Sequence, residues 1–273
     1  MQDSRRKEIR NKADLFRRKC GVKRYGIIDL FEVCLQEEYK LLRYPLGEGA
    51  DLGFVIKKDD DIVIFTNSCS RLSREIFTLA HEIGHVILHL DTGSTFIDNT
   101  ITLSERSMDE REQEANFFAA CLLMPEDSVK KFIEFQIQTS SEKEMSALDI
   151  ARIMSEFGVS FDMALNQLQN LNIINQKQRT CLDNEKTETR VGNLLRSVGG
   201  NARLNVPSNE IDIPPEYIDY TIYNYNHNAI PKETLVKVLS CYQLSIEDVR
   251  DKITNHLSDS EDDLEELIEE LDD

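Results

Sequence analysis

The chain has 273 residues, of which 40% are hydrophobic and 30% are charged, and its formal net charge is −18. This length allows one large domain or two modest ones, and the hydrophobic fraction is sufficient for a packed core. The acidic balance argues against a general nucleic-acid-binding surface, and no apolar run approaches the ~20 residues that a membrane-spanning helix needs.

The start of the chain and its cysteines predict a cytoplasmic protein. Residues 2–7 are polar and mostly charged, and no apolar segment of the kind found in a secretory signal follows them. The six cysteines are scattered without a Cys-x-x-Cys pair, which is typical of reduced and mostly buried thiols.

The first predicted elements are two helices and a β-hairpin. Residues 5–20 predict a helix whose many Arg and Lys side chains form a solvated face. Residues 27–41 predict a second helix with its apolar side chains mainly inward. Residues 52–56 and 62–66 are rich in β-branched and aromatic residues and flank a polar turn, so we expect two antiparallel strands.

A metal-binding motif lies in the next predicted helix. Residues 76–90 carry apolar side chains at helical spacing, and His81-Glu82-Ile83-Gly84-His85 stands among them. The two histidines are four residues apart, so both imidazoles project from one helix face, as two ligands of a single Zn²⁺ require. Glu82 lies beside them, where its carboxylate can act on a water that the metal activates. We therefore expect a catalytic zinc site.

A hydrolytic zinc site needs a third protein ligand, and His89 is poorly placed for that role. It lies two turns beyond His81, about 12 Å along the helix axis, which is too far for both to bind one ion. The metzincin pattern would need a glycine where Leu88 stands and a ligand where Asp91 stands. We expect His89 to orient a ligand histidine or to complement the end of the helix.

The third ligand is expected on the following helix, which residues 109–124 predict and Pro125 ends. Glu112 and Glu114 are both candidates, and they point about 200° apart on a helix, so only one can face the metal. We favour Glu112, because Asn116 lies four residues later on the same face and could orient a zinc-bound histidine. Glu114 remains the alternative third ligand, and both acids could also be solvated residues of a helix N-terminus.

These two motif blocks together resemble the ImmA/IrrE family of metallopeptidases. The first block is residues 74–89 and the second is residues 112–125, and a weaker likeness extends over about the first two-thirds of the chain. The resemblance implies a zincin-like fold, in which an edge strand beside the active-site helix can pair with an extended peptide. It also implies that His81, His85 and Glu112 hold the metal and that Glu82 is the base. Members of the family cut or control a helix-turn-helix repressor in bacterial and phage regulation.

Three helices are predicted after Pro125. The first covers residues 126–135, and the other two, at 147–157 and 161–171, are joined by a short turn with Gly158 and resemble a helix-turn-helix. We prefer a packed αα corner, because residues 162–170 include no Arg or Lys that could contact phosphates. Direct nucleic-acid binding is therefore not expected.

The remaining sequence predicts a linker, a small helical domain and an acidic tail. Residues 176–210 are mostly polar and predict the linker, and residues 211–257 predict the domain, with helices at 231–242 and 245–257. The tyrosines between 217 and 225 have helical spacing, which favours a core role over a partner surface. The tail, residues 258–273, has ten acids and no bases. A solubilising tail and a tail that docks on the basic N-terminal helix both remain open.

The expected fold is a mainly helical α+β protein. Residues 1–175 would form a zincin-like metallopeptidase domain with a small β-sheet, followed by the linker, the small helical domain and the tail. The expected function is zinc-dependent cleavage of a regulatory protein such as a helix-turn-helix repressor. Mn²⁺ is a possible alternative metal, because availability can override affinity.

A second hypothesis is a non-cleaving protein that uses the same fold to sequester its partner, as an anti-repressor does. The presence of Glu82 counts against it, because a binding scaffold needs no base beside the metal. The oligomeric state is left open by the sequence.

Overall fold

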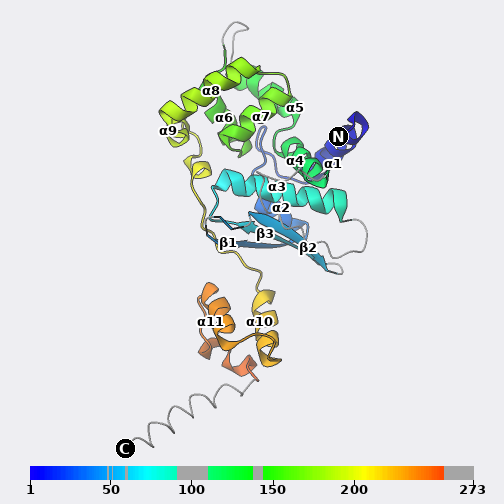
Figure 1. Ribbon diagram of the computed structural model, residues 1–273, viewed down its shortest axis with the longest axis vertical. Coiled ribbons are helices and arrows are strands. Elements are labelled where there is room, and N and C mark those ends of the chain that lie inside the picture. Colours follow the sequence, from blue (N-terminus) through cyan, green and yellow to red (C-terminus); the bar gives the residue numbers. More distant parts are fainter. Residues whose placement is uncertain (48, 51, 59–60, 91–109, 138–143, 255–273) are drawn as a thin grey trace, which may run out of the picture. The chain divides into compact units, whose positions relative to one another are not determined.

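A computed structural model describes residues 1–47, 49–50, 52–58, 61–90, 110–137 and 144–254 of the chain (Figure 1). The chain divides into two units, residues 1–212 and residues 213–273. The acidic tail at 258–273 lies outside the described residues.

The first unit contains a three-stranded sheet made of β1 (Lys40–Tyr44), β2 (Gly53–Lys58) and β3 (Asp61–Asn67). The strand order is β1-β3-β2. β2 and β3 pair in antiparallel fashion, which confirms the predicted hairpin, whereas β1 runs parallel to β3. β2 is therefore an edge strand of this sheet within the described part of the chain.

The helix predicted over residues 27–41 is wrong in its second half. α2 covers only Leu30–Gln36, after which the chain enters β1. Asp29 caps the helix by accepting hydrogen bonds from two backbone N–H groups, and Glu38 at φ 61° ends it. A parallel strand is stabilised by a partner that is distant in the sequence, so local spacing did not indicate β1.

Three helices pack together on one side of the sheet (Figure 1), and α3 (Leu72–His89), the one that contacts the sheet, carries the histidines. α3 packs on β2 and β3, and α4 (Glu110–Leu123) packs on α3 and on α1 (Asp3–Arg17) (Figure 1). Gly84 lies where α3 meets α4, and a Cβ at this position would stand 3.2 Å from the Ala115 backbone. The glycine therefore reflects a close helix contact, which sets the spacing of the two helices that carry the expected ligands.

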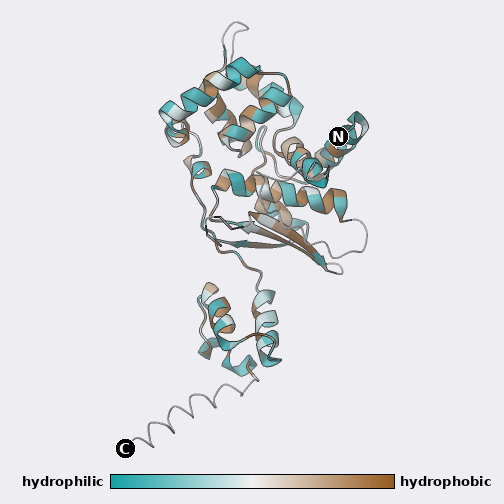
Figure 2. Ribbon diagram, viewed as in Figure 1, coloured by the Kyte–Doolittle hydropathy of each residue, from teal (hydrophilic) through white to brown (hydrophobic). Residues whose placement is uncertain are grey.

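The next helices form a packed layer. α5 (Glu126–Phe132) and a π-helical turn (Ile133–Ile137) precede α6 (Ala147–Phe157) and α7 (Phe161–Asn170). Gly158 at φ 70° turns the chain between α6 and α7. Both helices carry hydrophobic residues along their length (Figure 2). Six apolar side chains of these helices are buried in the main core: Ile150, Ile153, Phe157, Phe161, Leu165 and Leu168. This burial agrees with the predicted αα corner.

The linker expected at 176–210 is wrong for most of its length. This segment forms α8 (Gln176–Thr189), α9 (Val191–Ser197) and a 3₁₀ turn (Ala202–Asn205). A few leucines bury it in the core of the first unit, namely Leu182, Leu194, Leu195 and Leu204. Each of these short helices buries only one narrow face, so most of its residues are polar. The composition of the segment therefore resembles that of a linker, although the segment is folded.

The first unit ends in a segment that is fastened to β1 and α3. Leu72 N–H donates to the Val206 carbonyl at 2.9 Å, and Arg43 and Asp212 exchange two backbone hydrogen bonds. The Ser208 hydroxyl donates to Glu75 at 2.8 Å, and Arg43 makes a two-pronged ion pair with the same buried carboxylate. The chain between the helical layer and the second unit is thus part of the first unit.

The second unit is small and helical. It contains α10 (Glu216–Asn226), α11 (Lys232–Cys241) and a 3₁₀ helix (Glu247–Lys252), so the long helix predicted over 245–257 is wrong for its described residues. Its core has five members: Ile222, Tyr225, Leu235, Leu239 and Val249. Of the tyrosines in α10, Tyr217, Tyr220 and Tyr223 are exposed, which contradicts the expected core role for these three. Only one face of α10 packs into the core of the second unit, and the three exposed tyrosines lie outside that face.

None of the helices in the described residues combines the length and the apolarity that crossing a membrane requires.

Candidate metal centre

The fold brings His81, His85 and Glu112 together, although α3 and α4 carry them from separate parts of the chain. The Nε2 atoms of the two histidines are 3.0 Å apart, and each lies 3.2 Å from a different carboxylate oxygen of Glu112. All three ligand atoms lie within 4.8 Å of one another. Both histidines are buried, and Glu112 is about a quarter exposed.

The imidazole ring of His81 is oriented by a hydrogen bond from its Nδ1 atom. Its Nδ1 lies 3.0 Å from the Oδ1 of Asn116, which stands one turn after Glu112 on α4. An amide oxygen can only accept, so His81 donates from Nδ1 and its Nε2 lone pair faces the centre. The interaction predicted for Asn116 is therefore present.

His85 is held by a chain of three side chains. Its Nδ1 lies 3.1 Å from Nδ1 of His89, and Nε2 of His89 lies 3.1 Å from Glu114. Arg5 of α1 donates two hydrogen bonds to the Glu114 carboxylate, at 2.7 and 2.6 Å. Glu114 thus points away from the centre, toward Arg5 and His89, and is not placed as a third ligand.

This chain also determines which nitrogen of His85 carries the proton. The Arg5 guanidinium lowers the pKa of Glu114 to about 2, so this carboxylate is an acceptor at neutral pH. Burial lowers the pKa of His89, so its single N–H lies on Nε2 and is donated to Glu114. Nδ1 of His89 must then accept from Nδ1 of His85. The Nε2 of His85 is left with a lone pair that faces the centre.

The donor set fits a divalent metal ion. Glu112 supplies a carboxylate to the group, and both imidazoles present their Nε2 lone pairs toward it. Two imidazole lone pairs and a carboxylate at this separation repel one another unless a cation lies between them. Two histidines and one glutamate are the ligands of an open hydrolytic site.

Glu82 lies next to the centre and is fully buried. Its carboxylate lies against β2, where a Cβ on residue 53 would stand 3.2 Å from Oε1 of Glu82 and 2.4 Å from Cγ2 of Thr78. Gly53 therefore provides the room in which Glu82 and Thr78 fit. A buried carboxylate beside a metal centre is suited to proton transfer.

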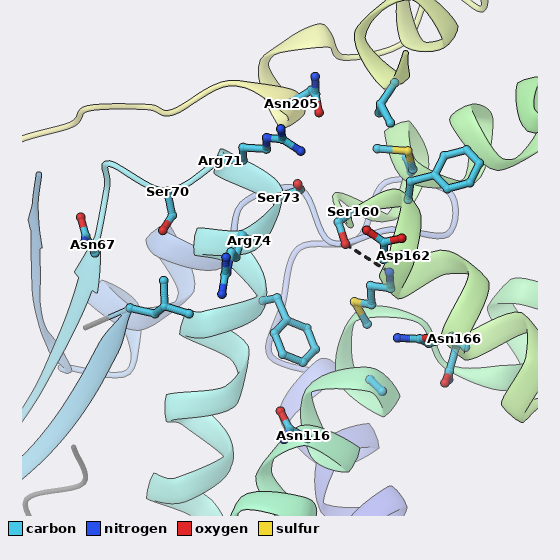
Figure 3. A pocket seen from close by; sticks show the side chains of 18 of the residues that line it. Asn67, Ser70, Arg71, Ser73, Arg74, Asn116, Ser160, Asp162, Asn166 and Asn205 are labelled. Atoms are coloured by element: carbon cyan, nitrogen blue, oxygen red, sulfur yellow. Dashed lines mark hydrogen bonds between the residues drawn. The ribbon is translucent and has the colours of Figure 1, made fainter. Parts of the chain in front are cut away.

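A cleft of about 1040 Å³ lies along the first half of α3 and approaches the candidate metal centre at Asn116. It reaches Asn116, which contacts His81, and its walls include Arg71 at the N-cap of α3, Arg74 of α3 and Asp162 of α7 (Figure 3). Phe77 of α3 also lines it. Residues of the segment that leads into β2 also line it, including Ala50 and Leu52. The cleft is large enough for several residues of a peptide.

Sequence reasoning did not identify Arg5 or Gly53 as parts of the site. Arg5 was one of many basic residues in the first helix, and nothing in its spacing indicated a bond to Glu114, 109 positions away. Gly53 is the second residue of the strand predicted over 52–56, and a glycine there is a weak signal of close backbone approach.

Comparison with known proteins identifies relatives of this region. Residues 36–169 match the Peptidase_M78 family, described as the IrrE N-terminal-like domain. The Metallopeptidase ImmA of Bacillus subtilis (strain 168) is 27% identical over 126 residues, which are 46% of this chain and 71% of that relative. The Radiation response metalloprotease IrrE of Deinococcus radiodurans is 40% identical over 72 residues, or 26% of this chain and 22% of that relative.

Proposed function

We propose that the protein is a zinc-dependent endopeptidase that cleaves one regulatory protein. The match of residues 36–169 to the IrrE N-terminal-like domain supports this proposal, and so do the two relatives named as metallopeptidase and metalloprotease. The proposed substrate class is a helix-turn-helix repressor, as the family resemblance implies. The observation that carries the proposal is the group of two imidazoles and one carboxylate beside the buried Glu82.

The proposed metal ligands are His81, His85 and Glu112. The convergence of their ligand atoms supports this role, and so do the bonds that orient both imidazoles. We assign the orienting role to Asn116 for His81 and to His89 for His85. Glu114 acts through His89, because its carboxylate is engaged by Arg5.

Glu82 is proposed as the general base and then the general acid. When bound, the zinc ion supplies Lewis acidity that polarises the peptide carbonyl and makes a water easier to deprotonate. Glu82 takes the proton of that water and returns it to the leaving amine, which requires its carboxylate to be within hydrogen-bond reach of both. Its burial against Gly53 fixes the carboxylate in one place, so little reorganisation accompanies the proton transfer.

β2 is proposed as the strand that aligns the substrate. It is an edge strand in the described part of the sheet, and it packs against α3, which carries the histidines. An extended peptide can add to such an edge by backbone hydrogen bonds, which hold its carbonyl near the metal centre whatever its side chains are.

The competing hypothesis is a non-cleaving protein that only sequesters its partner. One experiment separates the two: the zinc-loaded protein is incubated with purified helix-turn-helix repressors encoded next to it, and the fragments are analysed by mass spectrometry. Wild type should cut one repressor at one bond, and Glu82→Gln, which keeps the size of the side chain, should bind zinc but cut at least ~100-fold more slowly. Tight binding of a repressor without cleavage by wild type would support sequestration instead.

A further inference from the structure

The cleft beside the metal centre has a positive wall in a protein whose formal net charge is −18. Three arginines line it: Arg71 at the N-cap of α3, Arg74 of α3 and Arg6 of α1. Neither Arg71 nor Arg74 makes an ion pair with another described residue. The acid among the described lining residues, Asp162, is already paired with Lys186 at 2.5 Å. The described walls therefore carry more positive than negative charge.

These arginines lie on the helix face that leads to the metal centre. Arg74, Phe77 and His81 are three and four residues apart on α3, so they share one face of this helix. Arg74 is seven residues before His81, which is about 10 Å along the helix axis. An extended peptide advances about 3.3 Å per residue, so this distance corresponds to about three residues of substrate.

We propose that the arginine wall of the cleft selects an acidic segment of the substrate, with an Asp or Glu about three residues from the cleaved bond. This inference rests on the proposed endopeptidase function and adds its specificity. A guanidinium in a cleft binds a carboxylate by charge and by paired hydrogen bonds, and concave walls strengthen the local potential. Phe77, between Arg74 and the centre, offers an apolar contact to the residue that lies in between.

Peptide binding tests the charge preference without cleavage. The zinc-loaded Glu82→Gln protein is titrated into three fluorescein-labelled decapeptides that are identical except for two adjacent positions, occupied by Glu, Gln or Lys. Fluorescence anisotropy should show the Glu peptide binding at least about fivefold more tightly than the Gln peptide, as two exposed ion pairs allow. The difference should shrink as salt is raised from 20 to 500 mM, because salt screens exposed charges.

Two double variants assign the preference to the cleft. Arg71→Gln with Arg74→Gln should abolish it, and Arg71→Glu with Arg74→Glu should reverse it in favour of the Lys peptide. Lys7→Gln with Arg18→Gln removes two exposed charges of α1 outside this cleft and should leave the preference unchanged. A Glu preference that survives the loss of Arg71 and Arg74 overturns the assignment.

Equal binding of the three peptides, or no binding of any, also overturns the inference. Equal binding would show that Arg71 and Arg74 do not attract a carboxylate of the peptide. The proposed function fails separately, if no repressor is cut. Where a repressor is cut, the absence of any acid two to four residues from the cleaved bond contradicts the expected spacing.

Discussion

At the residue scale, the site depends on which of two nearby glutamates faces the two histidines. Glu112 approaches both imidazoles at 3.2 Å, and Glu114 bonds to Arg5 and His89. The two side chains lie two positions apart on one helix, so they point in nearly opposite directions. A substitution of Glu112 should therefore remove a metal ligand, whereas a substitution of Glu114 should change only the orientation of a ligand histidine.

We predict that Glu112→Gln, His81→Ala and His85→Ala each abolish tight zinc binding. Glu114→Gln should lower zinc affinity by only about 10- to 100-fold, the usual scale for a residue that orients a ligand. Competition with a chromophoric chelator measures all four affinities. Equal losses for Glu112→Gln and Glu114→Gln would leave the third ligand unassigned, and a larger loss for Glu114→Gln would reverse the assignment.

A second prediction at this scale concerns Gly53. Gly53→Ala would place a methyl group 2.4 Å from Thr78 Cγ2 and 2.9 Å from the Phe65 carbonyl oxygen. Overpacking of this kind costs about 1–3 kcal/mol, and here it displaces the Glu82 carboxylate. We expect cleavage to fall while zinc binding is retained.

The matched control is Gly21→Ala, where the added methyl group meets Ile28 at an ordinary 3.6 Å. Urea unfolding and zinc content separate a local effect at Glu82 from general loss of structure. Unchanged cleavage in Gly53→Ala would show that the base does not depend on this contact.

At the scale of elements, the site depends on α1 as well as on α3 and α4. Arg5 reaches from α1 to Glu114 on α4, and Glu114 reaches His89 at the end of α3. Each step is a hydrogen bond to a charged or buried group, so the three helices are held in one arrangement around the metal. The basic N-terminal helix is therefore partly an internal support, and not only a solvated face.

We predict that Arg5→Gln weakens zinc binding by about tenfold, because Glu114 and His89 then lose the bonds that hold them. Arg5→Lys should restore part of the affinity, since an ammonium supplies the charge but not the two parallel bonds. Lys7→Gln, an exposed change on the same helix, is the control. Chelator competition on the three variants decides the matter, and equal affinities for Arg5→Gln and Lys7→Gln would contradict this role for α1.

At the scale of the whole molecule, the metal centre and the cleft belong entirely to residues 1–212. The last part of this unit, residues 206–212, is bonded to β1 and α3. Glu75 is buried with the Ser208 hydroxyl, Arg43 and Thr66 as its hydrogen-bond partners. The stability of the first unit should therefore depend on this segment and not on the second unit.

We predict that a protein ending at Asp212 unfolds in urea with the same free energy as the first unit of the full chain and binds zinc equally well. A protein ending at Asn205 should be less stable by at least about 1–3 kcal/mol, because the buried Glu75 loses one of its partners. Urea unfolding and zinc titration of both truncations test this. Equal stability of the two proteins would show that residues 206–212 contribute nothing to the first unit.

The histidine motif and the glutamate–asparagine pair were predictable because the residues of each pair lie one helical turn apart in the sequence. His81 and His85 lie one helical turn apart, and Glu112 and Asn116 share a face, so periodicity alone placed each pair correctly. The β2–β3 hairpin was predictable for the same reason, since a short polar turn joins two β-rich runs. The αα corner at Gly158 also follows from local signals.

Other features were decided only by the tertiary structure, because they depend on partners that are distant along the chain. β1 is stabilised by pairing with β3, and the supposed linker is stabilised by four leucines that enter a core built elsewhere. Arg5, 109 positions away from Glu114, binds the Glu114 carboxylate, and this bond directs Glu114 away from the two histidines that Glu112 approaches. The sequence by itself therefore determined the metal-binding chemistry and its helices, whereas packing decided how α1, the sheet and the cleft surround them, because long-range contacts leave no periodic signal in either partner.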